Sequence, residues 1–186
     1  MRRALDLVYA SALVASAAAL VTIAVLVFVQ IAGRLLDRVL RAMGGESVGL
    51  QVPSLAEIGG FLLVGAAFLA LPATLRSAGH VRVTMLAKSV PPPFDRWLNA
   101  LVLLAALALT VFAAWNSGLQ ALDSWQFNSV SIGTIRIPLW IPQGVMTLGL
   151  CLLALALFDE LVTALRGETP AFVTAEDSRG IDGGGH

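Results

Sequence analysis

Long apolar stretches with few or no charged residues alternate with short polar ones along the whole chain. Crossing the hydrocarbon core of a bilayer takes about 20 apolar residues in a helix. Four stretches reach or approach this length, at residues 7–33, 55–75, 97–122 and 137–160. Because backbone groups in lipid must hydrogen-bond within their own segment, we predict a helix for each stretch. The pattern therefore predicts an all-α integral membrane protein with a four-helix transmembrane domain over residues 1–166.

The first apolar stretch begins like a secretory signal, with Arg2 and Arg3 ahead of it. No charged residue occurs between Asp6 and Arg34, however. The apolar region of a signal peptide is only about 7–15 residues long. We therefore expect a retained membrane helix.

The residues that follow this stretch, "GRLLDRVLRAMGG", are amphipathic. Leu35, Leu36 and Val39 fall on one helical face, and the arginines and Asp37 fall on the other. Two interpretations are open. Residues 34–43 form a short interfacial helix lying in the headgroup plane, or they continue the first helix beyond the membrane.

Composition agrees with the membrane class. The chain is 58% hydrophobic and 13% charged, whereas soluble domains are nearer half apolar and a quarter charged. There is no basic run typical of nucleic-acid binding, and the single cysteine, Cys151, excludes a disulfide framework. Residues 167–186 are polar and glycine-rich, and we expect a disordered cytoplasmic tail.

The distribution of Lys and Arg predicts an orientation, since cytoplasmic loops carry an excess of positive charge. With the N-terminus in the cytoplasm, the outside receives Arg34, Arg38, Arg41 and Arg136. The inside receives the larger set, which comprises Arg2, Arg3, Arg76, Arg82, Lys88, Arg96, Arg166 and Arg179. We therefore predict a multi-pass protein of the bacterial inner membrane with both termini in the cytoplasm.

The predicted spans contain no convergent polar set that would support chemistry. Glu57 opens the second span, and Asp159 and Glu160 close the fourth, all within reach of the interface. His80 lies in a loop and His186 in the tail, so no axial haem ligands lie inside the spans. We predict no catalytic, cofactor-binding or metal site.

The spans do offer packing surface. Ala106, Thr110, Ala114 and Gly118 recur every four residues and form one small face on the third span. Small faces let helix backbones approach closely in lipid. Packing within the four helices and docking of another protein are both open for this face.

Several of these features together resemble a known family. The segment "AEIGGFLLVGAAFLALPATLRSAGHVRVTML" is similar to the small, four-span (Q-type) membrane subunit of TRAP (tripartite ATP-independent periplasmic) transporters. In that family a carboxylate opens the second span, as Glu57 does here, and a Gly-His-x-Arg-Val strip follows it, here Gly79, His80 and Arg82. A Pro-x-Trp-x-Pro element, here Pro138, Trp140 and Pro142, leads into the fourth span. The likeness covers roughly Arg3 to Leu165.

The resemblance implies a non-enzymatic role. In such systems a periplasmic protein captures a small organic acid or similar solute, and a large multi-span subunit carries it inward on a sodium gradient. The small subunit resembles a brace that packs on the large subunit and helps dock the binding protein. Its partners would be these two proteins and membrane lipids, with no nucleic acid and no cofactor.

The cationic strip after the second span has two interpretations. Arg76, Arg82 and Lys88 are explained as topology anchors near anionic headgroups. The Gly79-His80 pair is better explained by a segment lying flat at the interface, with His80 as a hydrogen-bonding residue.

Other functions stay open from the residues alone. An autonomous small carrier or exporter would need an essential carboxylate in a span, and Glu57 is its candidate. A membrane-complex assembly factor is the other alternative.

Overall fold

The computed structural model describes residues 2–76 and 92–166. Over these residues the chain forms four helices, which are α1 (Arg2–Ala42), α2 (Leu55–Arg76), α4 (Pro92–Gln126) and α5 (Trp140–Arg166). All four are long and apolar enough to cross a membrane. The prediction of an all-α protein with four transmembrane helices is confirmed.

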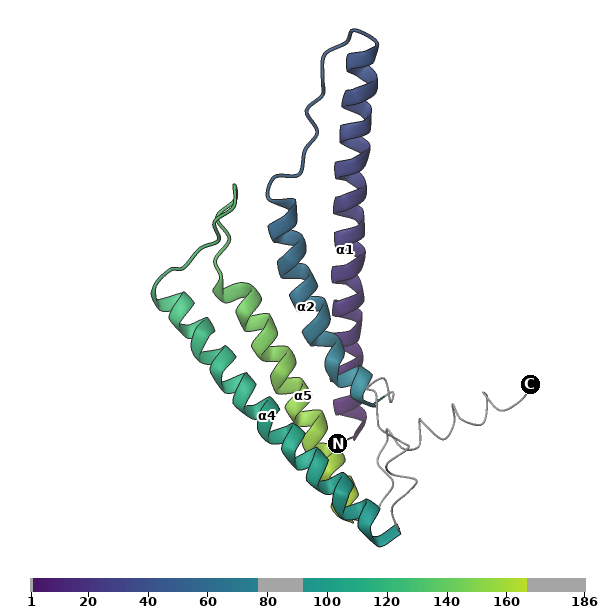
Figure 1. Cartoon of the computed structure of the whole chain (residues 1–186), viewed down its shortest axis with the longest axis vertical. Coiled ribbons are helices and arrows are strands. Elements are labelled where there is room, and N and C mark those ends of the chain that lie inside the picture. The colour runs from purple at the N-terminus through teal and green to yellow at the C-terminus, as the bar shows by residue number, and fades with distance from the viewer. Residues whose placement is uncertain (1, 77–91, 167–186) are drawn as a thin grey trace, which may run out of the picture.

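The helices lie side by side in a row. α2 packs between α1 and α5, and α5 packs between α2 and α4. Successive helices run in opposite directions, so the loops after α1 and α4 emerge at the same end of the layer (Figure 1). We call this end the hairpin end, and the opposite one the N-terminal end. Among residues 2–76 and 92–166, such a row leaves both broad faces of the layer without a helix over them.

α1 contacts its neighbour along one narrow stripe of residues. Buried positions recur at intervals of three or four residues, the spacing that keeps side chains on one helical face. Small residues at this stripe let the α1 and α2 backbones approach, and the Ser16 hydroxyl donates a 2.7 Å hydrogen bond to the Ala66 carbonyl. The buried positions are Tyr9, Ala12, Ser16, Gln30, Gly33 and Asp37.

The contact between α2 and α5 is closer still, at Gly149. A Cβ atom at this position would lie 2.6 Å from the Phe68 carbonyl oxygen, nearer than a carbon and an oxygen can pack. Only glycine allows the two backbones this approach. One turn earlier on α5, Val145 lies against Gly65 of α2. Glycine on each helix therefore joins the α1–α2 pair to the α4–α5 pair.

α4 and α5 are joined by apolar and polar contacts at different heights. Near the N-terminal end, Leu103 of α4 clusters with Leu157 and Leu161 of α5. Nearer the hairpin end, the hydroxyls of Ser117 and Thr147 share a 2.7 Å hydrogen bond. Hydrogen bonds of this kind hold helices together where lipid offers no alternative partner.

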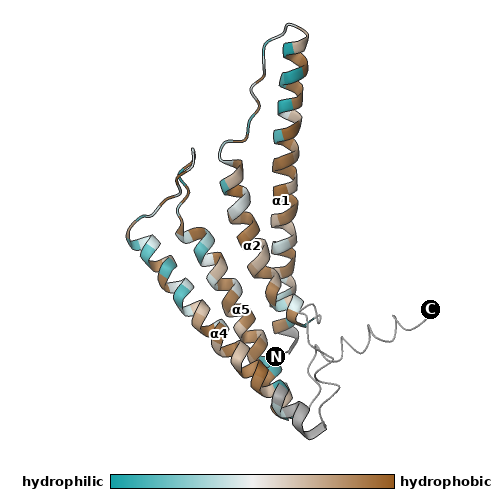
Figure 2. Ribbon diagram, in the orientation of Figure 1, coloured by the Kyte–Doolittle hydropathy of each residue, from teal (hydrophilic) through white to brown (hydrophobic). Residues whose placement is uncertain are grey.

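Residues 34–43 follow the second of the two interpretations given above. α1 runs without interruption to Ala42, so no separate interfacial helix begins at Arg34. At 1.5 Å per residue its 41 residues span about 61 Å, more than the roughly 40–45 Å of a whole bilayer. The hydrophilic positions of α1 gather toward the hairpin end (Figure 2).

The fourth helix begins later than the apolar stretch that predicted it. Pro138 forms an isolated antiparallel bridge with Val130, and Leu139 lies in a turn. The helix starts at Trp140, and Pro142 lies in its first turn. Proline is tolerated there because a first-turn N–H has no acceptor within the helix.

Candidate functional site

The hairpin end holds the densest set of specific polar contacts between distant parts of the chain. The loop between α4 and α5, residues 127–139, doubles back on itself, and we call it the hairpin loop. Its arms are joined by backbone bonds from Ser131 N to Ile137 O (2.9 Å) and from Leu139 N to Ser129 O (3.0 Å). The Ser131 hydroxyl adds a bond across the turn by accepting from Ile137 N at 3.1 Å.

Two residues at the start of α2 hold this loop. Glu57 Oε1 accepts a 3.0 Å hydrogen bond from Gly133 N, and Ser54 Oγ accepts a 2.9 Å bond from Ile135 N. These bonds bridge 76 and 81 residues of sequence. We call this set the Glu57 clamp, and it ties the α1–α2 pair to the α4–α5 pair at the hairpin end.

The clamp uses a sequence motif in an unusual way. Ser54-Leu55-Ala56-Glu57 reads as a capping box, in which the serine and glutamate side chains normally bond to backbone N–H groups of their own helix. Here both side chains bond to the hairpin loop instead, and the Ser54 backbone carbonyl accepts from Glu57 N and Ile58 N. Ser54 has a positive φ of 54°. A helix start has thus become a docking point for another loop.

The fit at Gly133 is tight. A Cβ atom there would lie 2.7 Å from the Glu57 Cδ atom and 2.8 Å from Ser54 Oγ. The second carboxylate oxygen, Oε2, is shielded from solvent and has no hydrogen-bond partner among the described residues. The positive end of the α2 dipole favours a carboxylate in this first turn.

A second carboxylate orders the other loop at this end. Residues 43–54, the return segment, run from the end of α1 back to the start of α2 (Figure 1). Asp37 Oδ1 accepts hydrogen bonds from Val48 N (2.8 Å) and Gly49 N (3.1 Å), and Gln30 Oε1 accepts from Val52 N at 2.6 Å. The return segment is therefore held against α1.

The N-terminal end carries an ion pair between two helices. Arg76 at the end of α2 pairs with Asp6 of α1, and its guanidinium carbon lies 5.3 Å from the centre of the Tyr9 ring. The carboxylates of Asp159 and Glu160 on α5 also act electrostatically on Arg76. Arg76 thus brings together charges from three helices.

The small face predicted on the third span is divided between two surroundings. Ala106 packs against the Leu103–Leu157 cluster, and Gly118 faces a Thr147 methyl group. Thr110 donates to the Ala106 carbonyl of its own helix at 2.8 Å. Contacts within the four helices therefore account for Ala106 and Gly118, and docking of another protein on this face stays a prediction.

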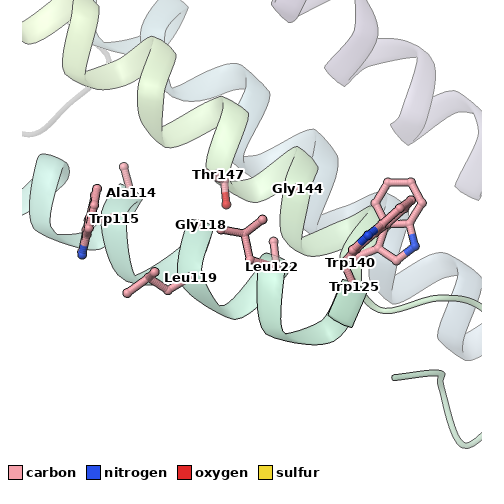
Figure 3. Close-up of a pocket in the computed structure, with 10 residues that line it drawn as sticks. Ala114, Trp115, Gly118, Leu119, Leu122, Trp125, Trp140, Gly144 and Thr147 are labelled. Carbon is pink, nitrogen blue, oxygen red and sulfur yellow. The ribbon is translucent and has the colours of Figure 1, made fainter. Parts of the chain in front are cut away.

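An apolar groove lies between α4 and α5 toward the hairpin end. Its volume is about 450 Å³, and we call it the α4–α5 groove (Figure 3). Trp125 and Trp140 stand at one end of it with ring centroids 4.8 Å apart in an edge-to-face arrangement. The lining residues are Ala114, Trp115, Gly118, Leu119, Ala121, Leu122, Trp125, Trp140, Gly144 and Thr147.

The remaining predicted residues fall in different places. Pro138 belongs to the hairpin loop, and Trp140 and Pro142 begin α5. Gly79, His80 and Arg82, like the tail over residues 167–186, lie outside the described residues. The predicted roles of the cationic strip and of the tail thus stay predictions.

Sequence reasoning missed the side chains that order the loops. Ser54 and Asp37 were not singled out for contacts, and Gln30, whose position near a span end suggests a hydrogen bond to another helix, bonds instead to Val52 N of the return segment. A signal existed for Ser54, because Ser-x-x-Glu before an apolar run marks a helix start. Gln30 and Asp37 lie 14 and 21 residues after Ser16, whole multiples of seven, so the sequence places them on the same stripe of α1. The backbone N–H groups that bond to them could not be read from the sequence.

Comparison with known families agrees with this architecture. Residues 23–167 match the DctQ component of tripartite ATP-independent periplasmic transporters. Neither curated proteins nor solved structures gave a match. The match covers most of the chain, including all of α2, α4 and α5.

Four apolar helices with loops held by packing contacts define a multi-pass membrane subunit. The chain belongs to the DctQ family and is the small component of a TRAP transporter rather than an enzyme. Members of this family work in complexes with a large permease and a substrate-binding protein.

Proposed function

We propose that this subunit braces the large permease subunit and helps dock the periplasmic binding protein. The observation that carries the proposal is the open row of helices. A protein that carries a solute alone needs a polar site enclosed near the bilayer midplane. A single layer, with uncovered apolar faces on both sides, instead offers surface to a larger membrane partner.

The edges of the layer supply that surface. On α1, the outermost helix on one side, Phe28 is 72% exposed, and on α4, the outermost on the other, Phe112 is 68% exposed. Exposed apolar side chains on a membrane helix face lipid or another membrane protein. We propose that the large permease covers one of these edges.

The hairpin end is the surface that we propose for the binding protein. In the orientation that we propose, with the N-terminus in the cytoplasm, this end lies in the periplasm. Ile132 at the turn of the hairpin loop is fully exposed, and Arg34, Arg38 and Arg41 line the far part of α1. The Glu57 clamp and the Asp37 bonds give this surface a fixed shape before any partner arrives.

The solute and its driving force belong to the complex as a whole. We propose sodium-driven uptake of a small organic acid or a similar solute, with this chain supplying no residue to the substrate site. The role of Glu57 in holding the hairpin loop supports this, because a carboxylate engaged in a structural bond is poorly suited to reversible substrate binding.

Site-specific photo-crosslinking tests the brace. A photoreactive phenylalanine analogue at Phe28 and, separately, at Phe112 changes each side chain little. In native membranes we expect at least one position to capture a much larger multi-span protein. Lipid adducts alone from both positions would contradict the proposal.

Glu57→Gln tests the alternative of an autonomous carrier. The chain reconstituted by itself in proteoliposomes should carry no solute, with or without the substitution. Solute uptake by the isolated chain that Glu57→Gln abolishes would overturn the brace.

A further inference from the structure

The α4–α5 groove is built differently from the other helix contacts. Its lining includes the small residues Gly118, Ala121 and Gly144, while Trp115 and Trp125 have 69% and 59% of their surface exposed. Small residues between bulky ones make a narrow slot that opens sideways into the space around the helices.

The chemistry of the slot excludes a polar occupant. The single polar side chain in its lining other than the indoles is Thr147. Its hydroxyl already bonds to the Ser117 hydroxyl and to the Gln143 carbonyl, both at distances of 2.7–2.8 Å. An occupant of the slot would therefore meet hydrocarbon and aromatic rings alone.

The length of the slot points to one acyl chain. From Ala114 to Trp125 the helix advances eleven residues, or about 16 Å. This is half of the roughly 30 Å hydrocarbon core, which is the depth of a single leaflet. A transmembrane helix from another protein is about 10 Å wide and crosses both leaflets, so this narrow half-length slot fits it poorly.

The end of the slot at Trp125 and Trp140 is complementary to a phosphate. No hydrogen bond from either indole N–H group occurs within the described residues, and both groups are donors only. Arg136 precedes Trp140 by four residues, so at most about 13 Å of extended chain separates them. Its exposed guanidinium pairs with no carboxylate within the described ranges. Asp123 lies two positions before Trp125 and so faces away from the slot.

We propose that the α4–α5 groove binds one phospholipid, with an acyl chain in the slot and the phosphate near Trp125, Trp140 and Arg136. The site goes beyond the bracing role and does not depend on it. In the proposed orientation this lipid belongs to the periplasmic leaflet. A lipid held here would fill the gap beside α4 and α5 and extend the apolar surface of the pair.

Native mass spectrometry of the full chain, with dioleoyl phosphatidylglycerol added to the detergent, tests the site. Gly144→Leu fills the slot, and a Cβ at Gly144 meets no atom within 4 Å, so the fold should tolerate it. Gly60→Leu on α2 is the matched control, because Gly60 also has open space and lies outside the groove. We expect one tightly bound lipid in the wild type and in Gly60→Leu, and at least tenfold weaker binding in Gly144→Leu.

A second variant pair tests the phosphate end. Arg136→Gln should weaken phosphatidylglycerol binding several-fold, and Arg34→Gln, which removes an equivalent charge from α1, should not. Equal lipid retention in Gly144→Leu and the wild type would overturn the proposal, as would the absence of a bound lipid from the wild type.

Photo-crosslinking in native membranes separates a lipid from a protein occupant. A photoreactive residue at Leu122, which lines the slot, should capture a phospholipid. Capture of a protein segment in its place would overturn the proposal, whatever the detergent experiments show.

Discussion

Two carboxylates order the two loops at the hairpin end, and they do so over very different sequence distances. Asp37 bonds to Val48 N and Gly49 N, 11 and 12 residues away. Glu57 bonds to Gly133 N, 76 residues away. Asp37 is 4% exposed, and one of its oxygens accepts both bonds, whereas Glu57 offers one oxygen to the loop and leaves the other without a partner among the described residues.

The two carboxylates therefore have different structural roles: Asp37 shapes a loop beside its own helix, and Glu57 joins the two helix pairs. Asp37 sets the path of the return segment at Val48 and Gly49, where the segment lies against its own helix. Glu57 decides whether the α1–α2 pair and the α4–α5 pair meet at the hairpin end. We therefore expect changes at the clamp to reach the stability of the whole layer, and changes near Asp37 to stay local.

Gly133→Ala should have the largest effect. The new methyl group would collide with both Glu57 and Ser54, and the hairpin loop must move away to admit it. Losing two hydrogen bonds and forcing a repacking should lower the free energy of unfolding by about 2–3 kcal/mol. Thermal unfolding in detergent measures this. Gly45→Ala, at the far end of α1, is the control and should change little, and equal effects of the two would contradict an assembling role for the clamp.

Asp37→Ala should come next, with a local effect. Val48 N and Gly49 N would lose their acceptor, and water can replace it because both residues are exposed. We expect hydrogen exchange at these two amides to quicken by ten- to thirtyfold, equivalent to about 1.4–2 kcal/mol. Protection within α2 and α5 should stay as in the wild type. Loss of protection there would show that the two carboxylates act as one unit.

Gly33→Ala should have two effects of similar size and opposite sign on the free energy of unfolding. Alanine favours the helix by about 1 kcal/mol over glycine. Its Cβ would displace the Leu50 carbonyl, which leaves no room for it. We expect a nearly unchanged melting temperature together with faster exchange at Val52 N, since the displaced segment would weaken its bond to Gln30. An unchanged exchange rate would mean that the return segment adapts without leaving α1.

Glu57→Gln should also change the stability little. The amide oxygen of glutamine can still accept from Gly133 N, and only the charge near the start of α2 is lost. We expect a change below about 1 kcal/mol. Glu57→Ala, which removes the acceptor, should approach Gly133→Ala. Equal losses in Glu57→Gln and Glu57→Ala would show that charge, rather than acceptance of this bond, holds the loop.

The number of helices and the position of their apolar middles could be predicted from the sequence, because lipid imposes length and hydropathy on every span. The order of the helices in the row could not be predicted from the sequence. That order depends on close backbone approaches such as the one between Gly149 and Phe68, and many glycines in these spans look equivalent in the sequence. Gly59, Gly60 and Gly144 all lack close neighbours, whereas Gly149 has one.

The polar contacts were predictable only in part. Glu57 stood out as a carboxylate at the start of a span, and its place at the interface was readable. The hydrogen-bond partner of Glu57 could not be predicted, because the backbone N–H group of Gly133 carries no mark in the sequence. The path of the chain beyond Gly33 was left open, because amphipathic residues suit either an interfacial helix or a continuation of α1. The bonds that hold the return segment join the Asp37 carboxylate to backbone N–H groups, which carry no mark in the sequence.

The span of sequence that each carboxylate bridges also sets when it can act during synthesis. The return segment can close on α1 once about 52 residues have been made. The clamp must wait for Gly133, and at roughly 5–20 residues per second the ribosome needs about 4–15 s to travel from Glu57 to that glycine. During this interval both helices of the α1–α2 pair have been made, but Glu57 does not yet have the hairpin loop to bind. The nascent first half is then the stage most open to a chaperone or to premature contact with the large subunit.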